Sequence, residues 1–224
     1  MSTKSKQLAG EKATEFIKDG MVLGLGTGST VYWTIQKLGE LVKGGLNIQG
    51  VPTSKQTEKL ANQLDIPLLS LSDVNDIDLT IDGADEANSN LELIKGGGGA
   101  LLREKMIASI SRRLVIVVDQ SKYVPELGHF PLPVEIVPFG WEITSKQIAA
   151  LGCLPQLRRE ERDPVVTDNG NYIVDCHFNT ISDAKQLDQA LNMIPGVVEN
   201  GLFVDMANEL IIGRDDGTID FLST

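Results

Sequence analysis

The sequence has few of the residue types that build disulfide scaffolds and metal centres. It contains two cysteines and two histidines among 224 residues. Cys153 and Cys176 are far apart in the chain, which argues against a disulfide framework and is typical of a reducing cytosol. Neither residue type shows the spacing of zinc ligands, so we interpret His129 and His177 as structural and expect no metal site.

Long apolar runs are also missing. The longest aliphatic run covers residues 114–118, far short of the roughly 20 residues that a membrane-spanning helix needs. Residues 1–16 are polar and charged, and they contain no apolar stretch of the kind found in signal peptides. We therefore expect a cytoplasmic protein, and the removal of an organellar transit peptide stays open.

Positive charge is in deficit. Twenty lysines and arginines face 31 aspartates and glutamates, so the formal net charge is −11. A negative field of this size repels nucleic acids and anionic membranes, and we expect neither as a partner. It would also repel a phosphorylated substrate, so an enzyme for such a substrate must focus its few cations in one cleft.

Helical and strand-like segments alternate in the first part of the chain. We expect helices at residues 6–18, 31–42, 57–63 and 100–111, and strands at residues 21–25, 48–52, 77–81 and 114–118. This alternation predicts an α/β fold with a Rossmann-like parallel sheet and helices on both faces. In such sheets, ligands bind beyond the carboxyl ends of the strands.

The pattern changes after about residue 129. Strands are expected at 132–137, 155–159, 171–178 and 197–204, with helices at 141–151 and at 182–193, the latter capped by Ser182. The order β-α-β-β-α-β is that of an α+β ferredoxin-like domain. A strand at 209–213 then returns to the first sheet. We predict a Rossmann-like catalytic domain at 1–128 with 206–224, and an inserted ferredoxin-like domain at 129–205.

A glycine turn, Gly24-Leu25-Gly26-Thr27-Gly28-Ser29-Thr30, follows the first strand. It lacks the third glycine of a dinucleotide-binding fingerprint and the Gly-Lys-Ser/Thr of a Walker A loop. Backbone N–H groups and the positive end of the following helix dipole would hold a phosphate there. Alternatively, Ser29 or Thr30 is only the N-cap of that helix, and both interpretations stay open.

Two further motifs carry charged groups. Asp82-Gly83-Ala84-Asp85-Glu86 places three carboxylates at the end of a strand, where they form a solvated turn, a divalent-metal site or a functional site. Asp119-Gln120-Ser121-Lys122 follows the run at 114–118, so Lys122 reaches the same edge of the sheet unless it is merely solvated.

The segment Lys95-Gly96-Gly97-Gly98-Gly99-Ala100 is the least ordinary part of the chain. Four consecutive glycines lose much entropy when they become ordered, so a loop without a function would seldom keep them. A close approach of the backbone to a ligand explains them better, with N–H groups turned toward an anionic oxygen. Glu104 follows one turn into the next helix, where it is either functional or a surface salt-bridge residue.

Together, these four segments resemble the A-type ribose-5-phosphate isomerase family in order and spacing, over essentially the whole length of the chain. The resemblance implies an isomerase that converts ribose 5-phosphate into ribulose 5-phosphate in the pentose phosphate pathway. It also implies that neither a metal nor another cofactor is needed. The partners that it implies are the sugar phosphate and further copies of the chain, in a homodimer or a dimer of dimers with the ferredoxin-like domain at the interface.

The resemblance also assigns residue roles by position. It implies that Glu104 is the general base and that Asp82, Asp85 and Lys95 surround the sugar oxygens. Of Asp82 and Asp85, Asp82 is the preferred acid/base for ring opening, and the division of roles between them stays open. The residues implied to hold the phosphate or to line the rest of the substrate site are Lys6, Thr27, Gly28, Ser29, Thr30, Gly83, Ala84, Gly96, Gly97, Gly98 and Lys122.

Two other functions remain to be weighed. The first is another isomerase, or a transferase, that acts on a phosphorylated sugar at the same edge of the sheet. The second is a sugar-phosphate-sensing domain like those of some transcriptional regulators. A sensor of that kind would need a basic DNA-binding segment, which this acidic chain lacks, and it would have no need of Glu104.

Overall fold

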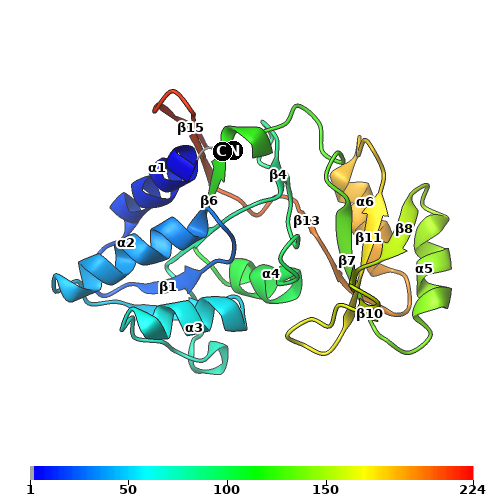
Figure 1. The fold of residues 1–224 in the computed structure, drawn as a ribbon, viewed down its shortest axis with the longest axis horizontal. Helices are drawn as coiled ribbons and strands as arrows, with labels where there is room; N and C mark the ends of the chain where they lie inside the picture. Colours follow the sequence, from blue (N-terminus) through cyan, green and yellow to red (C-terminus); the bar gives the residue numbers. More distant parts are fainter. Residues whose placement is uncertain (1–2, 224) are drawn as a thin grey trace. The chain divides into compact units, whose positions relative to one another are not determined.

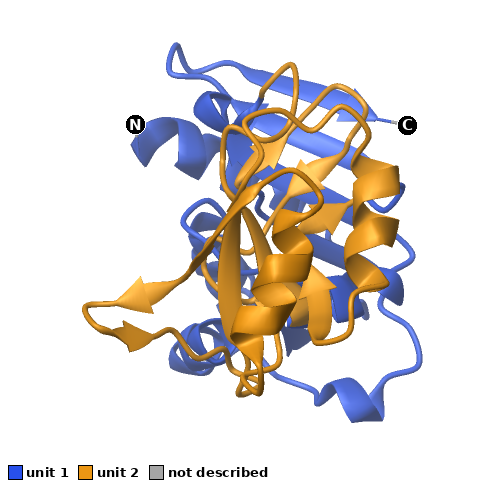
Figure 2. Cartoon of the chain, turned by 90° about the vertical axis from the view of Figure 1, so that its right-hand side faces the viewer, with its two compact units in different colours: residues 1–84, 103–123, 205–224 blue, residues 85–102, 124–204 orange. Residues whose placement is uncertain are grey.

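The computed structural model describes residues 3–223, which form two compact units (Figure 2). Unit 1 contains residues 3–84, 103–123 and 205–223, and unit 2 contains residues 85–102 and 124–204. Residues 1, 2 and 224, at the ends of the first predicted domain, lie outside the described residues. The predicted boundaries kept residues 85–102 in the first domain, whereas here they pack with unit 2.

Unit 1 is built on a six-stranded sheet with the order β15-β14-β6-β3-β1-β2. Neighbouring strands are parallel except at the edge, where β15 runs antiparallel to β14. The parallel sheet and the return of the late strand β14 beside β6 are both as predicted. The strands are β1 (Val22–Leu25), β2 (Gln49–Pro52), β3 (Leu79–Asp82), β6 (Leu114–Asp119), β14 (Glu209–Gly213) and the unpredicted β15 (Ile219–Ser223).

Helices cover both faces of this sheet. On one face, α1 packs against α2, and α3 shares their apolar core (Figure 1). On the other face, Ile107 of α4 packs with Val51 and Ile77. All six residues of β6 are buried, which fits a parallel strand covered on both sides. The helices are α1 (Thr3–Ala13), α2 (Val31–Lys43), α3 (Lys55–Gln63) and α4 (Leu101–Ser109), with short 3-10 turns at Thr14–Phe16, Leu71–Asp73 and Gln120–Lys122.

The first helix differs from its predicted bounds, because α1 begins at Thr3 and gives way to a 3-10 turn after Ala13. Gly10 allows α1 to lie close to the start of α2. A Cβ atom at Gly10 would be 2.6 Å from the carbonyl oxygen of Thr30. Lys6, about one turn earlier in α1, contacts Ser29 in the loop that precedes α2. No helix within residues 3–223 is long and apolar enough to cross a membrane.

Unit 2 contains a four-stranded antiparallel sheet with the order β12-β7-β11-β8. Its chain order, β7-α5-β8-β11-α6-β12, is the β-α-β-β-α-β order that was predicted. Alternate residues of β7 pack into the same core cluster as residues of α5 and α6. The elements are β7 (Leu132–Ile136), α5 (Trp141–Ala149), β8 (Leu154–Leu157), β11 (Tyr172–His177), α6 (Ala184–Asn192) and β12 (Val197–Asn200), with a small hairpin of β9 (Arg159–Glu160) and β10 (Asp163–Pro164) after β8.

Two local predictions for this unit were wrong. The N-cap of α6 is Asp183, whose side chain accepts a hydrogen bond from the Gln186 N–H, so Ser182 is not the cap. The strand expected at 197–204 breaks at Gly201, whose N–H donates to the Pro133 carbonyl. Its second part, β13 (Leu202–Phe203), pairs instead with β5 (Leu93–Ile94), which in turn pairs with β4 (Glu86–Ala87). These pairings place the segment from β4 to β5 in unit 2.

Candidate active site

The loop at residues 26–30 lies at the carboxyl edge of the unit 1 sheet, between the end of β1 and the start of α2. The chain passes from β1 to β2 on one side and later to β3 on the other side. Such a switch point is where open α/β sheets bind their ligands. Thr30 occupies the N-cap position of α2, but its side chain makes no capping hydrogen bond. Side-chain capping therefore does not explain Thr30.

The structure brings one cationic group to this loop. Lys6 of α1 donates a hydrogen bond from Nζ to Ser29 Oγ at 2.9 Å, and the same Nζ lies 4.0 Å from Asp119 Oδ2. Asp119 ends β6, and its Oδ1 accepts hydrogen bonds from the N–H of Ser121 at 2.9 Å and from its hydroxyl at 2.5 Å. These bonds order the turn that carries Lys122. The ammonium group of Lys6, on α1, therefore lies beside the N-terminal end of α2.

Asp82, the last residue of β3, is buried and connects that strand to the same loop. Its Oδ1 accepts hydrogen bonds from the Thr27 N–H at 3.0 Å and from the Gly83 N–H at 2.7 Å. A Cβ atom at Gly26 would be 2.3 Å from this oxygen, so only glycine fits there. Two backbone donors therefore fix the direction of the Asp82 carboxylate.

A cluster of hydroxyl groups holds Thr27 of this loop in place. Its other members, at residues 53, 54 and 57, were not predicted from the sequence. Thr27 Oγ1 lies 2.7 Å from Thr53 Oγ1, 2.8 Å from Ser54 Oγ and 3.0 Å from Thr57 Oγ1. Thr57 also donates to the Gly26 carbonyl at 2.8 Å. Ser54 is the N-cap of α3 and accepts from the Thr57 N–H, so the spacing Ser-x-x-Thr before a helix was the available signal.

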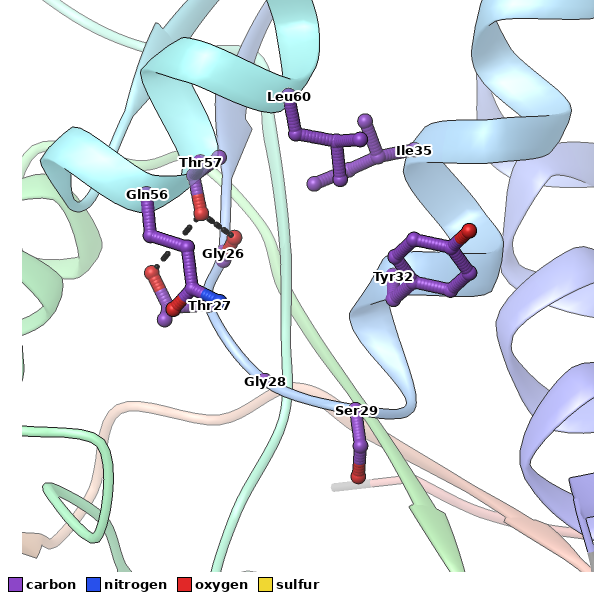
Figure 3. Close-up of a pocket in the computed structure, with 9 residues that line it drawn as sticks. All are labelled: Gly26, Thr27, Gly28, Ser29, Tyr32, Ile35, Gln56, Thr57 and Leu60. Carbon is purple, nitrogen blue, oxygen red and sulfur yellow. Dashed lines mark hydrogen bonds between the residues drawn. The ribbon is translucent and has the colours of Figure 1, made fainter.

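A cavity of about 310 Å³ lies beside the loop, between α2 and α3 (Figure 3). Ile35 and Leu60 point toward each other across it, while the Ser29 side chain points away from them. Of the described residues that line the cavity, none is charged. The Lys6 ammonium meets the loop at Ser29, whose side chain points away from Ile35 and Leu60. The lining residues are Gly26, Thr27, Gly28, Ser29, Tyr32, Ile35, Gln56, Thr57 and Leu60.

In unit 2, the glycine-rich segment is held against Asp85. The Gly97 N–H donates to Asp85 Oδ2 at 2.7 Å, and a Cβ atom at Gly97 would lie 2.5 Å from Asp85 Oδ1. Gly96 and Gly99 have φ values of +101° and +79°, in the region that favours glycine. Gly97 and Gly98 are exposed. The positive φ values explain glycine at positions 96 and 99, and the close contact with Asp85 explains it at position 97.

Lys95, directly before the glycines, is only 2% exposed. Its N–H donates to the Gly201 carbonyl at 2.8 Å, and its Nζ lies 5.4 Å from the centre of the Phe203 ring. The ring face attracts the ammonium group and lowers the cost of its burial. Lys95 is therefore not a solvated surface residue.

Glu104 is the fourth residue of α4 and is 4% exposed. The alternative of a surface salt-bridge residue is therefore wrong. A carboxylate in the first turn of a helix is favoured by the helix dipole. The sequence prediction of a functional carboxylate one turn after the glycines is compatible with this position.

The three carboxylates of the segment 82–86 have separate partners. Glu86 accepts hydrogen bonds from the N–H groups of Gly128 at 2.7 Å and Phe130 at 2.6 Å, so it is a structural residue of unit 2. Among residues 3–223, no group of three or more His, Cys, Asp or Glu side chains is arranged to hold a metal ion.

The two cysteines lie closer together than their sequence separation suggests. Cys176 is in β11, and Cys153 directly precedes β8, the neighbouring strand; both are free thiols. A hydrogen bond that the Cys176 thiol donates to the Cys153 sulfur, together with burial, raises the pKa of Cys176. The same hydrogen bond lowers the pKa of Cys153.

Comparisons with known proteins agree with one another. A family model described as "Ribose 5-phosphate isomerase A (phosphoriboisomerase A)" matches residues 49–217. A ribose-5-phosphate isomerase A of Bacillus mycoides is 58% identical over 217 residues, which cover 96% of this chain and 98% of the relative. The ribose 5-phosphate isomerase of Plasmodium falciparum superposes with a TM-score of 0.96 at 39% identity, covering 100% of this chain and 99% of that one. A D-ribose-5-phosphate isomerase solved in complex with phospho-erythronic acid has a TM-score of 0.95 at 42% identity, covering 99% and 98%. The chain belongs to the ribose 5-phosphate isomerase A family.

Proposed function

We propose that the chain interconverts D-ribose 5-phosphate and D-ribulose 5-phosphate through a cis-enediolate, with Glu104 as the general base. The isomerase activity follows from the family, one member of which shares 58% identity with this chain over nearly its whole length. The enediolate, the residue roles and a place in the non-oxidative branch of the pentose phosphate pathway are the parts that we propose.

The reaction transfers protons within one molecule. A base removes the proton from C2 of the open-chain aldose, and the C1 carbonyl becomes an enediolate oxygen. The base then returns the proton to C1, while the O2 hydroxyl proton passes to O1 and C2 becomes the carbonyl carbon. One carboxylate can perform both carbon proton transfers if it is held beside C1 and C2.

The observation that carries the proposal is the position of Glu104. It is a buried carboxylate in the first turn of α4, which begins immediately after the glycine-rich segment. Burying a carboxylate is costly, so a residue without a function would seldom be retained there. Donors that meet developing charge on oxygen are each worth about 3–4 kcal/mol, and we assign that role to Lys95 and the amides of 96–98.

We propose that Ser29, Thr30, Lys6 and Lys122 hold the phosphate at the N-terminal end of α2. The contact between Lys6 and Ser29 supports this assignment, because it places a cation beside the helix end. The relative solved with phospho-erythronic acid supports a phosphorylated polyhydroxy ligand. Thr27, Gly28, Gly83 and Ala84 remain proposed contacts to the rest of the substrate.

Ring opening needs a second acid/base group. We propose Asp82, whose Oδ1 is held by two backbone donors. Asp85 is then a contact to the sugar hydroxyls. The homodimer or dimer of dimers, with residues 129–205 at its interface, and the lack of a cofactor remain proposals on the basis of the sequence resemblance.

Glu104→Gln tests the base, since the change keeps the shape of the side chain and removes its basicity. We expect kcat to fall by about 10²–10⁴-fold while KM for ribose 5-phosphate changes little. Exchange of the C2 proton with deuterated water should fall equally. Glu58→Gln is the matched control, because Glu58 is the exposed fourth residue of the equally long helix α3. More than about a tenth of the wild-type kcat in Glu104→Gln would show that another group is the base.

A further inference from the structure

Arg158 lies between β8 and β9, and its guanidinium joins two parts of unit 2. Its Nε donates to Asp175 Oδ2 at 2.8 Å, and its Nη2 pairs with Asp175 Oδ1. Its Nη1 donates to the carbonyl oxygens of Gly96 and Gly97, each at 3.0 Å. The Arg158 and Asp175 side chains are only 16% and 21% exposed. The arginine therefore connects β11 to the glycine-rich segment.

These contacts fix the directions of the neighbouring amides. In a trans peptide, the N–H points away from the C=O of the same unit, and residues 3–223 contain no cis peptide bond. The Gly97 N–H, opposite the Gly96 carbonyl, donates to Asp85 Oδ2 at 2.7 Å. The Gly98 N–H, opposite the Gly97 carbonyl, also points away from Arg158. The Gly97 N–H is thus turned toward Asp85, and the Gly98 N–H is turned away from the guanidinium.

The geometry requires arginine rather than any cation. A guanidinium offers five N–H donors in a rigid planar fork, so it can bind a carboxylate with one edge and carbonyl oxygens with another. A lysine at this position is a point charge on a flexible stem. It could keep the ion pair with Asp175 or a contact with the carbonyls of Gly96 and Gly97, and it would not hold both groups in fixed directions.

We propose that Arg158 is a positioning residue for the isomerase reaction. It holds the Gly96 and Gly97 carbonyls so that the Gly97 N–H keeps Asp85 in place and the Gly98 N–H meets the charge that develops on the substrate. The inference rests on the proposed function, because the enediolate is what puts charge on a substrate oxygen. Arg158 itself acts through the loop and not on the substrate.

The role predicts a selective kinetic effect. In Arg158→Lys, kcat should fall by about 10–100-fold while KM for ribose 5-phosphate stays within about twofold, since the phosphate is held by other residues. The inhibition constant of phospho-erythronic acid, whose carboxylate stands in for the enediolate oxygens, should rise about tenfold or more, and that of inorganic phosphate should not change. Arg159→Lys is the matched control, because Arg159 is exposed and donates to the Arg162 carbonyl instead.

The measurements are steady-state kinetics, inhibition by both anions, and the thermal unfolding midpoint of each variant. A wild-type kcat in Arg158→Lys would overturn the proposal, as would equal losses of affinity for phospho-erythronic acid and inorganic phosphate. If Arg158→Lys does not fold, Asp175→Asn applies the same test, with a smaller kcat loss and the same selectivity expected. Full turnover by Glu104→Gln would instead refute the base, and the two failures are therefore distinguishable.

Discussion

Replacing Gly97 by alanine would disturb one side chain of the proposed site with little other change. The new Cβ would lie 2.5 Å from Asp85 Oδ1 and 2.9 Å from both Cγ and Oδ2. Real Cβ atoms essentially never come closer than 3.0 Å to another heavy atom, so the Asp85 carboxylate must move by about half an ångström. Gly97 is not among the residues with positive φ, so its backbone accepts alanine and the variant should fold.

The size of the effect follows from the bond that is disturbed. Moving the carboxylate weakens its 2.7 Å hydrogen bond from the Gly97 N–H. A hydrogen bond to a charged group contributes about 1.5–3 kcal/mol, so kcat/KM should fall by about 10- to 100-fold. Most of the loss should appear in kcat, because binding of the phosphate does not depend on this segment in the proposed mechanism.

The assay is ketose formation from ribose 5-phosphate by Gly97→Ala, Asp85→Ala and the double variant. If Gly97→Ala acts through Asp85, it should cost little more once Asp85 is already alanine. Gly44→Ala is the control, because Gly44 ends α2 outside the site and its Cβ would approach the Leu41 carbonyl oxygen no closer than 3.2 Å. Unchanged kcat/KM in Gly97→Ala, or fully additive losses in the double variant, would refute the reasoning.

Two further predictions concern the phosphate and the cofactor. Lys122→Ala should lower kcat/KM for ribose 5-phosphate by about one to two decades, because it removes a charge-assisted hydrogen bond to the phosphate. The slow reaction of unphosphorylated ribose, measured at matched ionic strength, should scarcely change. Equal losses for both sugars would show that Lys122 does not act at the phosphate. Activity should survive exhaustive dialysis against EDTA, and a loss that a divalent ion restores would contradict the proposed cofactor-free reaction.

The sheet of unit 1 was predictable because the hydrophobic pattern of each strand is contained in a short stretch of sequence. The run at 114–118 is aliphatic throughout, and every residue of β6 is buried, so pattern and environment agree. The small sheet of β4, β5 and β13 carried no such signal. Its strands are two residues long, too short to show a hydrophobic period, and β13 comes from a distant part of the chain to pair with β5. This is why residues 85–102 were expected in the first domain.

The motifs of the proposed site were visible for a similar reason. Glycines, carboxylates and lysines that act in a turn lie next to one another in the sequence, as Asp82 and Asp85 do. Their roles still depend on contacts that are not local. Asp82 is fixed by the N–H of Thr27, which is 55 residues away in the chain. The sequence indicated which turns carry the polar groups, and the structure shows which backbone groups orient each carboxylate.

Residues that hold the turns in place leave no motif at all. Arg158 reaches the Gly96 carbonyl across 62 residues, and Lys6 reaches Ser29 across 23. Nothing next to Arg158 in the sequence distinguishes it from Arg159, yet one binds the glycine-rich segment and the other is exposed. The difference arises from the register of β8 against β11, which places the Arg158 N–H on the Ile173 carbonyl and its side chain beside Asp175. Because a shift of one residue exchanges the two faces of a strand, such a residue can be recognised only when the pairing is known.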